Sequence, residues 1–414
     1  MRKNFITGLI SGLCGALLLV AITGAVYVYV GSKTKVNQDN GVNTQEEAQS
    51  LTEKTPYGEI VQKLTFLEML VNNYYLNNVD QESYADNIYK GFIRSLDDPY
   101  STYYTKEEYS ALMESSSGVY CGIGAIVSQD VKTGIITIVK PFADGPANEA
   151  GLLPGDILYK VEDEEVTGVD LPKVVSEMKG IEGTQVRISI MRENVSDPME
   201  FTITRKKIEN PTIEYKMLED KIGYIAISEF DEITVTQFVA AVNDLEKSGM
   251  KGLVVDVRNN PGGLLDSVVK MLDRLLSKGL IVYTEDKYGK RMEEDALDSL
   301  KLEVPLAVII NGNSASASEI FAGAVQDYKI GTIVGTTSFG KGIVQKVIPL
   351  SDGTAVKLTI SKYYTPLGRN IHGTGIVPDI KVELPDELKQ AMVIPPDKDN
   401  QLQEAIKIVK DNIK

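Results

Sequence analysis

The sequence predicts an α/β protein with a β-rich segment in its middle. Two uninterrupted runs of mostly β-branched residues, at 253–257 and 304–310, predict strands that are covered on both faces of a sheet. Helical patterns follow these runs at 264–276 and 316–326. Short β-rich runs separated by turn residues occupy residues 115–205. These three observations favour a layered α/β core that is preceded by a smaller β-rich domain.

The C-terminal half alternates strands with helices. Residues 222–227 predict one more strand, 234–247 a helix, and 400–413 a short amphipathic helix at the end of the chain. In open α/β sheets, functional sites gather at the carboxyl ends of the strands. We therefore expect chemistry at residues 258–265 and 311–319.

The middle segment reads as five strands and one helix. The strands are expected at 124–127, 134–139, 156–161, 185–191 and 199–204, and the helix at 171–179.

The segment before it, 57–109, has a helical pattern, with a second helix at 84–95 that ends before Asp97-Asp98-Pro99. Its tyrosines are either ligand platforms or amphipathic packing residues at a domain or subunit seam. They are Tyr74, Tyr75, Tyr84, Tyr89, Tyr100, Tyr103 and Tyr104.

Composition excludes several classes of function. The chain has 414 residues, a net charge of −15 and a pI of about 4.8, and it contains no clustered Lys/Arg run, so nucleic acid is not an expected partner. Its single histidine, His372, cannot build a His-rich zinc site, and we expect no metal and no cofactor. Cys14 and Cys121 provide no disulfide framework.

The N-terminus predicts a membrane segment. Arg2 and Lys3 precede an uncharged stretch over 4–32, long enough to cross a bilayer of about 30 Å. Residues 1–32 are therefore expected to anchor the chain, with the catalytic body outside the cytoplasm and residues 33–55 as a polar linker. A cleaved signal peptide is the alternative. Gly8 and Gly12 form a GxxxG pair that either packs two anchors together or occurs by chance.

A serine-rich segment follows the predicted strand at 304–310. In Ser314-Ala315-Ser316-Ala317-Ser318-Glu319, Ser316 and Glu319 fit a helix capping box. The same position at the start of a helix would also suit a nucleophile, because exposed N–H groups there stabilise negative charge. Both interpretations remain open from this segment alone.

A nucleophilic serine needs a base, and the chain offers His372 or Lys341. Lys341 lies in Phe339-Gly340-Lys341-Gly342, and to act as a base it must lose about three pKa units from ~10.4, which burial could supply. Gln345 could hydrogen-bond the amine without adding charge. Lys341 and Gln345 share a face only if this stretch is turned or helical, because in an extended strand they would lie about 13 Å apart.

A turn at Arg258-Asn259-Asn260-Pro261-Gly262-Gly263 ends the strand at 253–257. Pro followed by Gly-Gly is a tight turn by default. Its free N–H groups could also face a developing oxyanion.

Together, in this order and spacing, these three motifs resemble the carboxy-terminal processing peptidases, also called tail-specific proteases, of the S41 serine peptidase family. The resemblance runs from about residue 57 to 386 and implies a crotonase-like (ClpP/crotonase) α/β protease core. It implies Ser316 as the nucleophile, with Ser314 and Ser318 as its competitors. Lys341 would be the general base and Gln345 its orienting partner. The implied oxyanion donors are the N–H groups of Ala317 and of Gly262 or Gly263.

A second resemblance concerns residues 115–205. Gly145-Pro146-Ala147, Ala150-Gly151-Leu152 and Gly155-Asp156 are similar to the bacterial PDZ signature, and Gly122-Ile123-Gly124 lies where such domains have their carboxylate-binding loop. The resemblance implies that substrate C-termini add as a strand to the sheet edge. The alternative is that these glycines only make turns.

The resulting organisation has six parts. They are a membrane anchor (1–32), a linker (33–55), an N-terminal helical region (56–114), a PDZ domain (115–205), a protease core (206–386) and a C-terminal helical tail (387–414). The expected partners are proteins or peptides with accessible C-termini and the membrane, and the resemblance implies a homodimer through the terminal helices. Two competing functions are a catalytically inactive, membrane-tethered PDZ scaffold and a crotonase-like enzyme acting on an acyl thioester.

Overall fold

The computed structural model describes residues 57–79, 83–297, 302–389 and 394–413, and it divides into two units, 1–82 and 83–414. In the first unit the described element is helix α3 (Tyr57–Tyr74), none of whose residues is buried. The predicted anchor and linker over 1–55 lie outside the described residues. Among the helices that are described, none combines the length and the apolar character that a membrane span requires.

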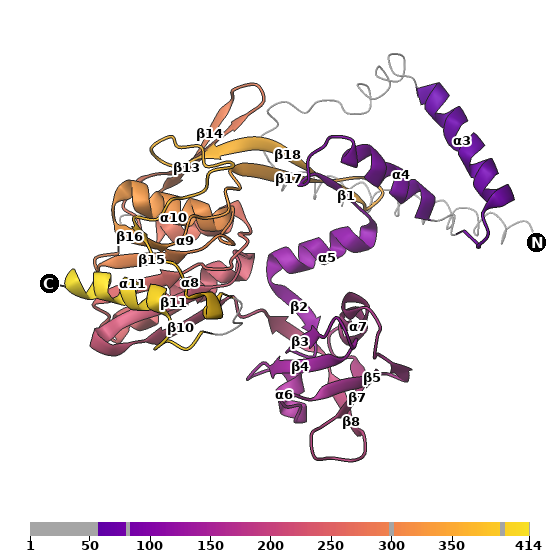
Figure 1. The fold of residues 1–414 in the computed structure, drawn as a ribbon, viewed down its shortest axis with the longest axis horizontal. Coiled ribbons are helices and arrows are strands. Elements are labelled where there is room, and N and C mark those ends of the chain that lie inside the picture. The colour runs from indigo at the N-terminus through magenta and orange to yellow at the C-terminus, as the bar shows by residue number, and fades with distance from the viewer. Residues whose placement is uncertain (1–56, 80–82, 298–301, 390–393, 414) are drawn as a thin grey trace, which may run out of the picture. The chain divides into compact units, whose positions relative to one another are not determined.

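The second unit is built around a six-stranded sheet in the order β10-β11-β12-β15-β16-β19 (Figure 1). All neighbouring pairs are parallel except β10 with β11. The strands predicted at 222–227, 253–257 and 304–310 are found as β11, β12 and β15. The six strands are β10 (Ile213–Met217), β11 (Ile222–Ile227), β12 (Gly252–Asp256), β15 (Leu306–Ile310), β16 (Gly331–Gly335) and β19 (Ile380–Lys381).

Helices cover both faces of this sheet, as the apolar runs predicted. Leu253 and Val255 pack in the cluster that includes helices α8, α9 and α10, whereas Val254 packs in the cluster that includes the C-terminal helix α11. Successive strand residues therefore point to opposite, equally buried faces. The helices are α8 (Glu232–Lys247), α9 (Leu265–Asp273), α10 (Ala317–Tyr328) and α11 (Asn400–Asp411).

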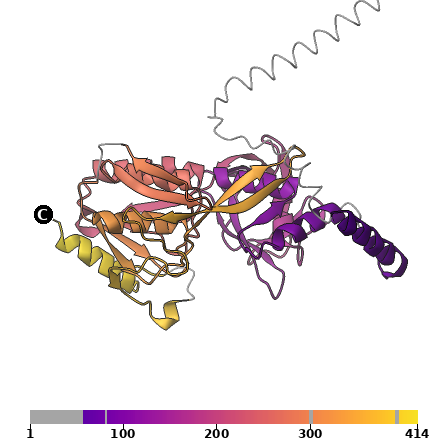
Figure 2. The same cartoon turned by 90° about the horizontal axis from the view of Figure 1, so that it is seen from above.

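A second, antiparallel sheet has the order β1-β18-β13-β14, with β17 paired to β18. Figure 2 shows β17 and β18 as a long ribbon that reaches out from the helices of the core. The sequence analysis predicted none of the strands of this sheet. The strands are β1 (Thr102–Tyr104), β13 (Gly279–Asp286), β14 (Arg291–Ala296), β17 (Ile343–Pro349) and β18 (Ala355–Tyr364).

The β-rich segment has a sheet and a buried core of its own. Five of its six strands match the predicted runs, whereas the two-residue strand β6 was not predicted, and its helix α7 (Leu171–Met178) matches the predicted helix. A separate pair, β2 (Val119–Gly122) with β9 (Lys206–Glu209), joins the two ends of the segment. The strands of the sheet are β3 (Ala125–Gln129), β4 (Ile136–Pro141), β5 (Ile157–Val161), β6 (Glu164–Glu165), β7 (Gln185–Met191) and β8 (Met199–Thr204), with the short helix α6 (Pro146–Ala150).

Helix α4 (Ser83–Arg94) is found where it was predicted, but helix α5 (Lys106–Ser117) was not predicted. Its signals are present in the sequence: Thr105 and Glu108 form a capping box, and Gly118 ends the helix with a φ of 68°. Helix α5 leads directly into β2 and so connects the core to the β-rich segment.

Candidate active site

Ser316 stands at the point where the chain leaves the loop after β15 and enters α10. Its φ of 55° and ψ of −113° are unusual for a residue with a side chain, and such a conformation typically costs about 1–3 kcal/mol. The Tyr363 hydroxyl donates a hydrogen bond to the Ser316 carbonyl oxygen at 3.1 Å. Burial raises the pKa of Tyr363 well above its usual value, so this hydroxyl keeps its proton. The backbone of Ser316 is thus held in a strained conformation by its surroundings.

The two neighbouring serines have structural roles. Ser314 is fully buried, and its hydroxyl donates to the Val257 carbonyl at 2.8 Å. Ser318 is also fully buried and donates to the Asn260 carbonyl at 2.9 Å. Both bonds connect the serine-rich segment 314–319, called the serine loop below, to the loop after β12. Of the three serines, Ser316 lies on the cavity described below.

Glu319 connects the serine loop to the segment 338–342, called the lysine loop below. Its fully buried carboxylate accepts hydrogen bonds from the N–H of Ser316 (2.8 Å), the N–H of Gly340 (2.7 Å) and the N–H of Lys341 (2.8 Å). It also accepts one from the Ser338 hydroxyl at 2.5 Å. The sequence assigned Glu319 only a helix-capping role, because nothing local to the motif shows that a loop from farther along the chain converges on it.

The glycine turn lies directly against Ser316. A Cβ atom added to Gly262 would lie 2.8 Å from the Ser316 Cβ, so only glycine allows this approach. The Gly262 N–H donates to Asn260 Oδ1 at 2.8 Å. Among the described residues, the N–H groups of Gly263 and Ala317 have no hydrogen-bond acceptor. Of the glycines proposed as oxyanion donors, Gly263 is therefore the one with a free N–H.

Lys341 is a half-buried lysine of the site, and a second half-buried lysine, Lys357, lines the same cavity. The Lys341 Nζ lies 4.8 Å from the centre of the Tyr100 ring and makes no hydrogen bond or ion pair with any described residue. Burial lowers the pKa of Lys341, and the nearby charge of Lys357 lowers it further, against the opposing charges of Glu319 and Asp98. The amine is thus destabilised in its charged form, as a base must be, while the aromatic ring of Tyr100 partly stabilises that form.

Gln345 lies in strand β17, so the stretch from Lys341 is extended rather than turned. The register between β17 and β18 shifts between Val344 and Gln345, and such a bulge redirects the side chains beyond it. The Gln345 Nε2 is buried and has no partner within the part of the chain that the structure describes. The predicted hydrogen bond between Gln345 and Lys341 is therefore not present in this structure, although both residues line the same cavity.

A cavity of about 610 Å³ collects these groups: Ser316, Ala317, Lys341, Gln345, Gly262 and Gly263 all line it. Helix α5 contributes part of its wall, through residues that include Leu112 and Met113. His372 does not line the cavity, and its side chain is exposed. The glycine beside Lys341 is explained by the backbone of His372, because a Cβ on Gly342 would lie 2.6 Å from the His372 nitrogen.

Comparisons with known proteins identify the family of this chain. The model described as "Peptidase family S41" matches residues 221–382, and the model described as "Activating protease CtpB N-terminal domain" matches residues 20–108. The carboxy-terminal-processing protease of Bartonella bacilliformis is 38% identical over 350 residues, which cover 83% of this chain and 78% of that protein. The chain belongs to peptidase family S41. The family predicted from the motifs is thereby confirmed.

Two further proteins are similar to this S41 peptidase. A probable CtpA-like serine protease of Staphylococcus haemolyticus is 37% identical over 354 residues, covering 84% of this chain and 70% of that protein. The crystal structure of a putative S41 protease from Bacteroides fragilis superposes with a TM-score of 0.51 at 18% identity, covering 82% of this chain and 93% of the other. The relatives make this chain a serine-type peptidase of the carboxy-terminal-processing kind, and the structural likeness shows the mixed α/β fold of S41 proteases.

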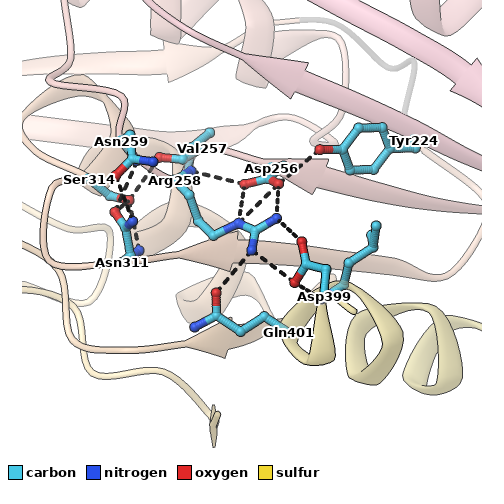
Figure 3. A network of polar contacts seen from close by, with 10 residues as sticks. Tyr224, Asp256, Val257, Arg258, Asn259, Asn311, Ser314, Asp399 and Gln401 are labelled. Atoms are coloured by element: carbon cyan, nitrogen blue, oxygen red, sulfur yellow. Dashed lines mark hydrogen bonds and ion pairs between the residues drawn. The ribbon is translucent and has the colours of Figure 1, made fainter. Parts of the chain in front are cut away.

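The arginine of the glycine-turn motif lies away from the cavity of this S41 peptidase. Figure 3 shows Arg258 between Asp256 at the end of β12 and Asp399 at the start of α11. Its guanidinium bonds Asp256 Oδ2 at 2.5 Å and Asp399 Oδ2 at 2.7 Å, and it also donates to Gln401. Tyr224 donates to the same Asp256 carboxylate at 2.9 Å. This buried network fastens the C-terminal helix to the central sheet.

The loop that is predicted to bind substrate C-termini has N–H groups without backbone acceptors among the described residues. The N–H groups of Ile123 and Gly124 make no backbone hydrogen bond with the described residues, whereas Gly122 belongs to β2. Strand β3 follows this loop and pairs only with β4, so it is an edge strand of its sheet. Free N–H groups beside an open strand edge are what an added peptide strand needs.

Proposed function

We propose that this S41 peptidase is a serine endopeptidase that cleaves proteins through a Ser316/Lys341 pair. The observation that carries the proposal is that Ser316, Lys341, Gln345 and two unpaired N–H groups, at Gly263 and Ala317, line one cavity. Burial that lowers the pKa of Lys341 supports its role as the base.

In this mechanism neutral Lys341 takes the proton from the Ser316 hydroxyl while Ser316 Oγ attacks the peptide carbonyl. The negative charge that forms on the carbonyl oxygen is stabilised by the N–H groups of Gly263 and Ala317. The lysine then gives its proton to the leaving amine, and water hydrolyses the acyl-enzyme by the reverse use of the same groups. Lys341 must leave the Tyr100 ring to do this, and the buried, unpartnered amide of Gln345 could receive and orient its amine.

Mass spectrometry of the products from an unfolded protein with an apolar C-terminus tests the dyad. The parent should produce defined fragments, and Ser316→Ala and Lys341→Met should produce them at least about a thousandfold more slowly. Lys346→Met is the matched control, since Lys346 is an exposed lysine on β17, the strand that follows Lys341.

If Ser316→Ala and Lys341→Met both cleave like the parent, the dyad is wrong. A parent that binds C-terminal peptides but cleaves nothing would instead support the inactive scaffold.

We further propose that residues 115–205 act as a PDZ-type domain that binds substrate C-termini through Gly122, Ile123 and Gly124. The free N–H groups at Ile123 and Gly124 and the open edge of β3 support this role. The crotonase-like description of the core is part of the same proposal, and the parallel sheet with helices on both faces is consistent with it.

We also propose that residues 1–32 anchor the protein in the cell membrane with its catalytic body outside the cytoplasm, and that it dimerises through its terminal helices. The uncharged stretch at 4–32 supports the anchor. The exposed apolar side chains of α3, among them Phe66 and Leu67, support an interface there. Digestion of intact spheroplasts by an added protease tests the topology: an intact catalytic body after digestion would contradict it. Sedimentation of the full chain with and without residues 57–79 tests the dimer.

A further inference from the structure

One corner of the catalytic cavity is acidic. Glu229, Asp231 and Glu232 lie in the segment from β11 to the start of α8, and all three line the cavity. Asp231 is only 6% exposed, and its Oδ2 is buried without a hydrogen-bond partner among the described residues. A buried carboxylate oxygen without a partner, on a residue that lines a substrate cavity, is unusual and needs an explanation such as a ligand.

Helix capping does not explain this carboxylate. Asp231 is the N-cap of α8, and its N–H donates a hydrogen bond to the Thr234 hydroxyl oxygen at 3.0 Å. A cap needs one side-chain oxygen, and serine or asparagine caps a helix as well as aspartate. The second oxygen and the negative charge therefore have no structural use at this position.

The charge is unfavourable unless something positive binds beside it. Burial, together with the neighbouring charge of Glu229, raises the pKa of Asp231 to about 6. Above that pH the carboxylate is mostly ionised, so near neutrality Asp231 is a buried charge that forms no ion pair with any residue the structure describes, although Lys341 and Lys357 line other parts of the cavity. A cationic group of a bound molecule would relieve this cost.

Asp231 lies next to a residue that is hydrogen-bonded to the glycine turn beside Ser316. Phe230 forms a bridge with Gly263: the Phe230 N–H donates to the Gly262 carbonyl at 3.0 Å, and the Leu264 N–H donates to the Phe230 carbonyl at 2.7 Å. Asp231 is the next residue after this bridge. It therefore directly follows a residue that is hydrogen-bonded to the glycine turn, which carries the proposed oxyanion donor and contacts Ser316.

We propose that Asp231, supported by Glu229, forms an acidic subsite that binds a lysine or arginine side chain of the substrate close to the scissile bond. This inference rests on the proposed protease function and adds a substrate preference to it. The apolar residues of the same cavity, among them Leu112, Met113 and Leu264, suit the methylene stem of such a side chain, while the carboxylates meet its charged end.

Paired peptides that differ only in charge test the subsite. A cleaved peptide is synthesised with arginine or its neutral isostere citrulline at each position flanking the bond that mass spectrometry identifies. At one position the parent should prefer arginine by about tenfold or more in kcat/KM, the range expected for a partly buried charge pair. In Asp231→Asn this preference should fall below about threefold, because arginine no longer meets a full charge.

Two further variants complete the experiment. Asp231→Ser is a second neutral helix cap and should lose the preference in the same way, which separates the effect from any folding defect of one variant. Asp244→Asn removes an exposed charge from the same helix, outside the cavity, and should keep the preference of the parent.

The outcomes separate this inference from the function it rests on. A parent that cleaves arginine and citrulline peptides equally at every position overturns the subsite and leaves the protease function intact. The subsite is also overturned if Asp231→Asn and Asp231→Ser keep the preference, or if they slow both peptides equally, as a purely structural role requires. A parent that cleaves neither these peptides nor unfolded protein contradicts the protease function itself.

Discussion

Lys341, the proposed base, has a pKa that burial and neighbouring charges push in opposite directions. Burial and the charge of Lys357 favour its neutral form, whereas Glu319 and Asp98 favour its charged form. The Tyr100 ring, 4.8 Å from Nζ, also favours the charge. The pKa of the amine is lowered overall, so its neutral form, which can accept a proton, is reached at a lower pH than in an ordinary lysine.

The pH dependence of cleavage should report this balance. Since the pKa of Lys341 is lowered from its usual 10.5, the neutral base accumulates as pH rises, and kcat/KM should increase to a plateau with a midpoint below 10.5. His372→Gln should keep the same profile and most of the activity, because His372 is exposed and outside the cavity. Stopped assays with one peptide across pH 5–10.5 measure both. A loss above about a hundredfold in His372→Gln would return histidine to the mechanism.

Tyr100 should tune the same midpoint. Tyr100→Leu keeps an apolar side chain beside Lys341 but removes the aromatic face, so the charged amine loses about 0.5–1 kcal/mol and the midpoint should fall by roughly half a pH unit. Tyr100→Phe keeps the ring and should match the parent. An unchanged midpoint in Tyr100→Leu, or the same shift in both variants, would show that the ring does not act on the amine.

The proposed catalytic groups depend on loops that the fold brings together from distant parts of the chain. The serine loop follows β15, the glycine turn follows β12, and the lysine loop precedes β17. The parallel pairing of β12 with β15 places the first two at one edge of the sheet. The lysine loop reaches them through the carboxylate of Glu319 at the start of α10.

Glu319→Gln should therefore affect both stability and catalysis. The amide offers N–H groups to backbone donors that the carboxylate now satisfies, so the free energy of unfolding should fall by about 2–4 kcal/mol. At a temperature where the variant is folded, kcat should fall more than KM rises, because the defect lies in the placement of Ser316 and Lys341. Urea unfolding and steady-state kinetics measure the two effects.

Glu383→Gln is the control for this substitution, since Glu383 is an exposed acid paired with Lys381 at the surface. Its stability should change by less than about 0.5 kcal/mol. If Glu319→Gln were equally silent, the carboxylate would not be the connector described above.

At the scale of the whole molecule, the β-rich segment is a self-contained insertion between helix α5 and the core. It has its own buried cluster, and its two ends are held together by the pairing of Val119 with Glu209. Helix α5, which lines the cavity, leads straight into it. The proposed site for C-termini and the proposed site for cleavage therefore lie on one chain.

Removing this segment should change substrate choice. The parent should cleave a peptide with a free C-terminal carboxylate faster than its C-terminal amide, by about tenfold, because only the carboxylate can meet the N–H groups of the 122–124 loop. A chain in which a short linker replaces residues 120–208 should cleave both peptides at similar rates. Equal rates already in the parent would remove the recognition role of this segment, and unfolding curves of both chains control for folding.

The sequence predicted most of the central architecture because its signals are local. Uninterrupted apolar runs indicated β12 and β15, and helical periodicity indicated α8 and α10. Strands β17 and β18 and helix α5 were missed, although the capping box at Thr105 and the glycine at 118 mark the helix. Strands β17 and β18 pair as a hairpin across the turn at Asp352-Gly353, which is a local signal that the sequence analysis did not use.

By itself, the sequence determined the family, the order of the motifs and the residue types available for chemistry, since one histidine and an acidic composition leave few mechanisms. Only the tertiary structure decided that Ser314 and Ser318 are bonded into the scaffold, that Gly263 rather than Gly262 has a free N–H, and that Tyr100 lies over Lys341. The physical reason is that hydrogen-bond satisfaction and burial depend on which distant segments meet, and that depends on the folded core as a whole.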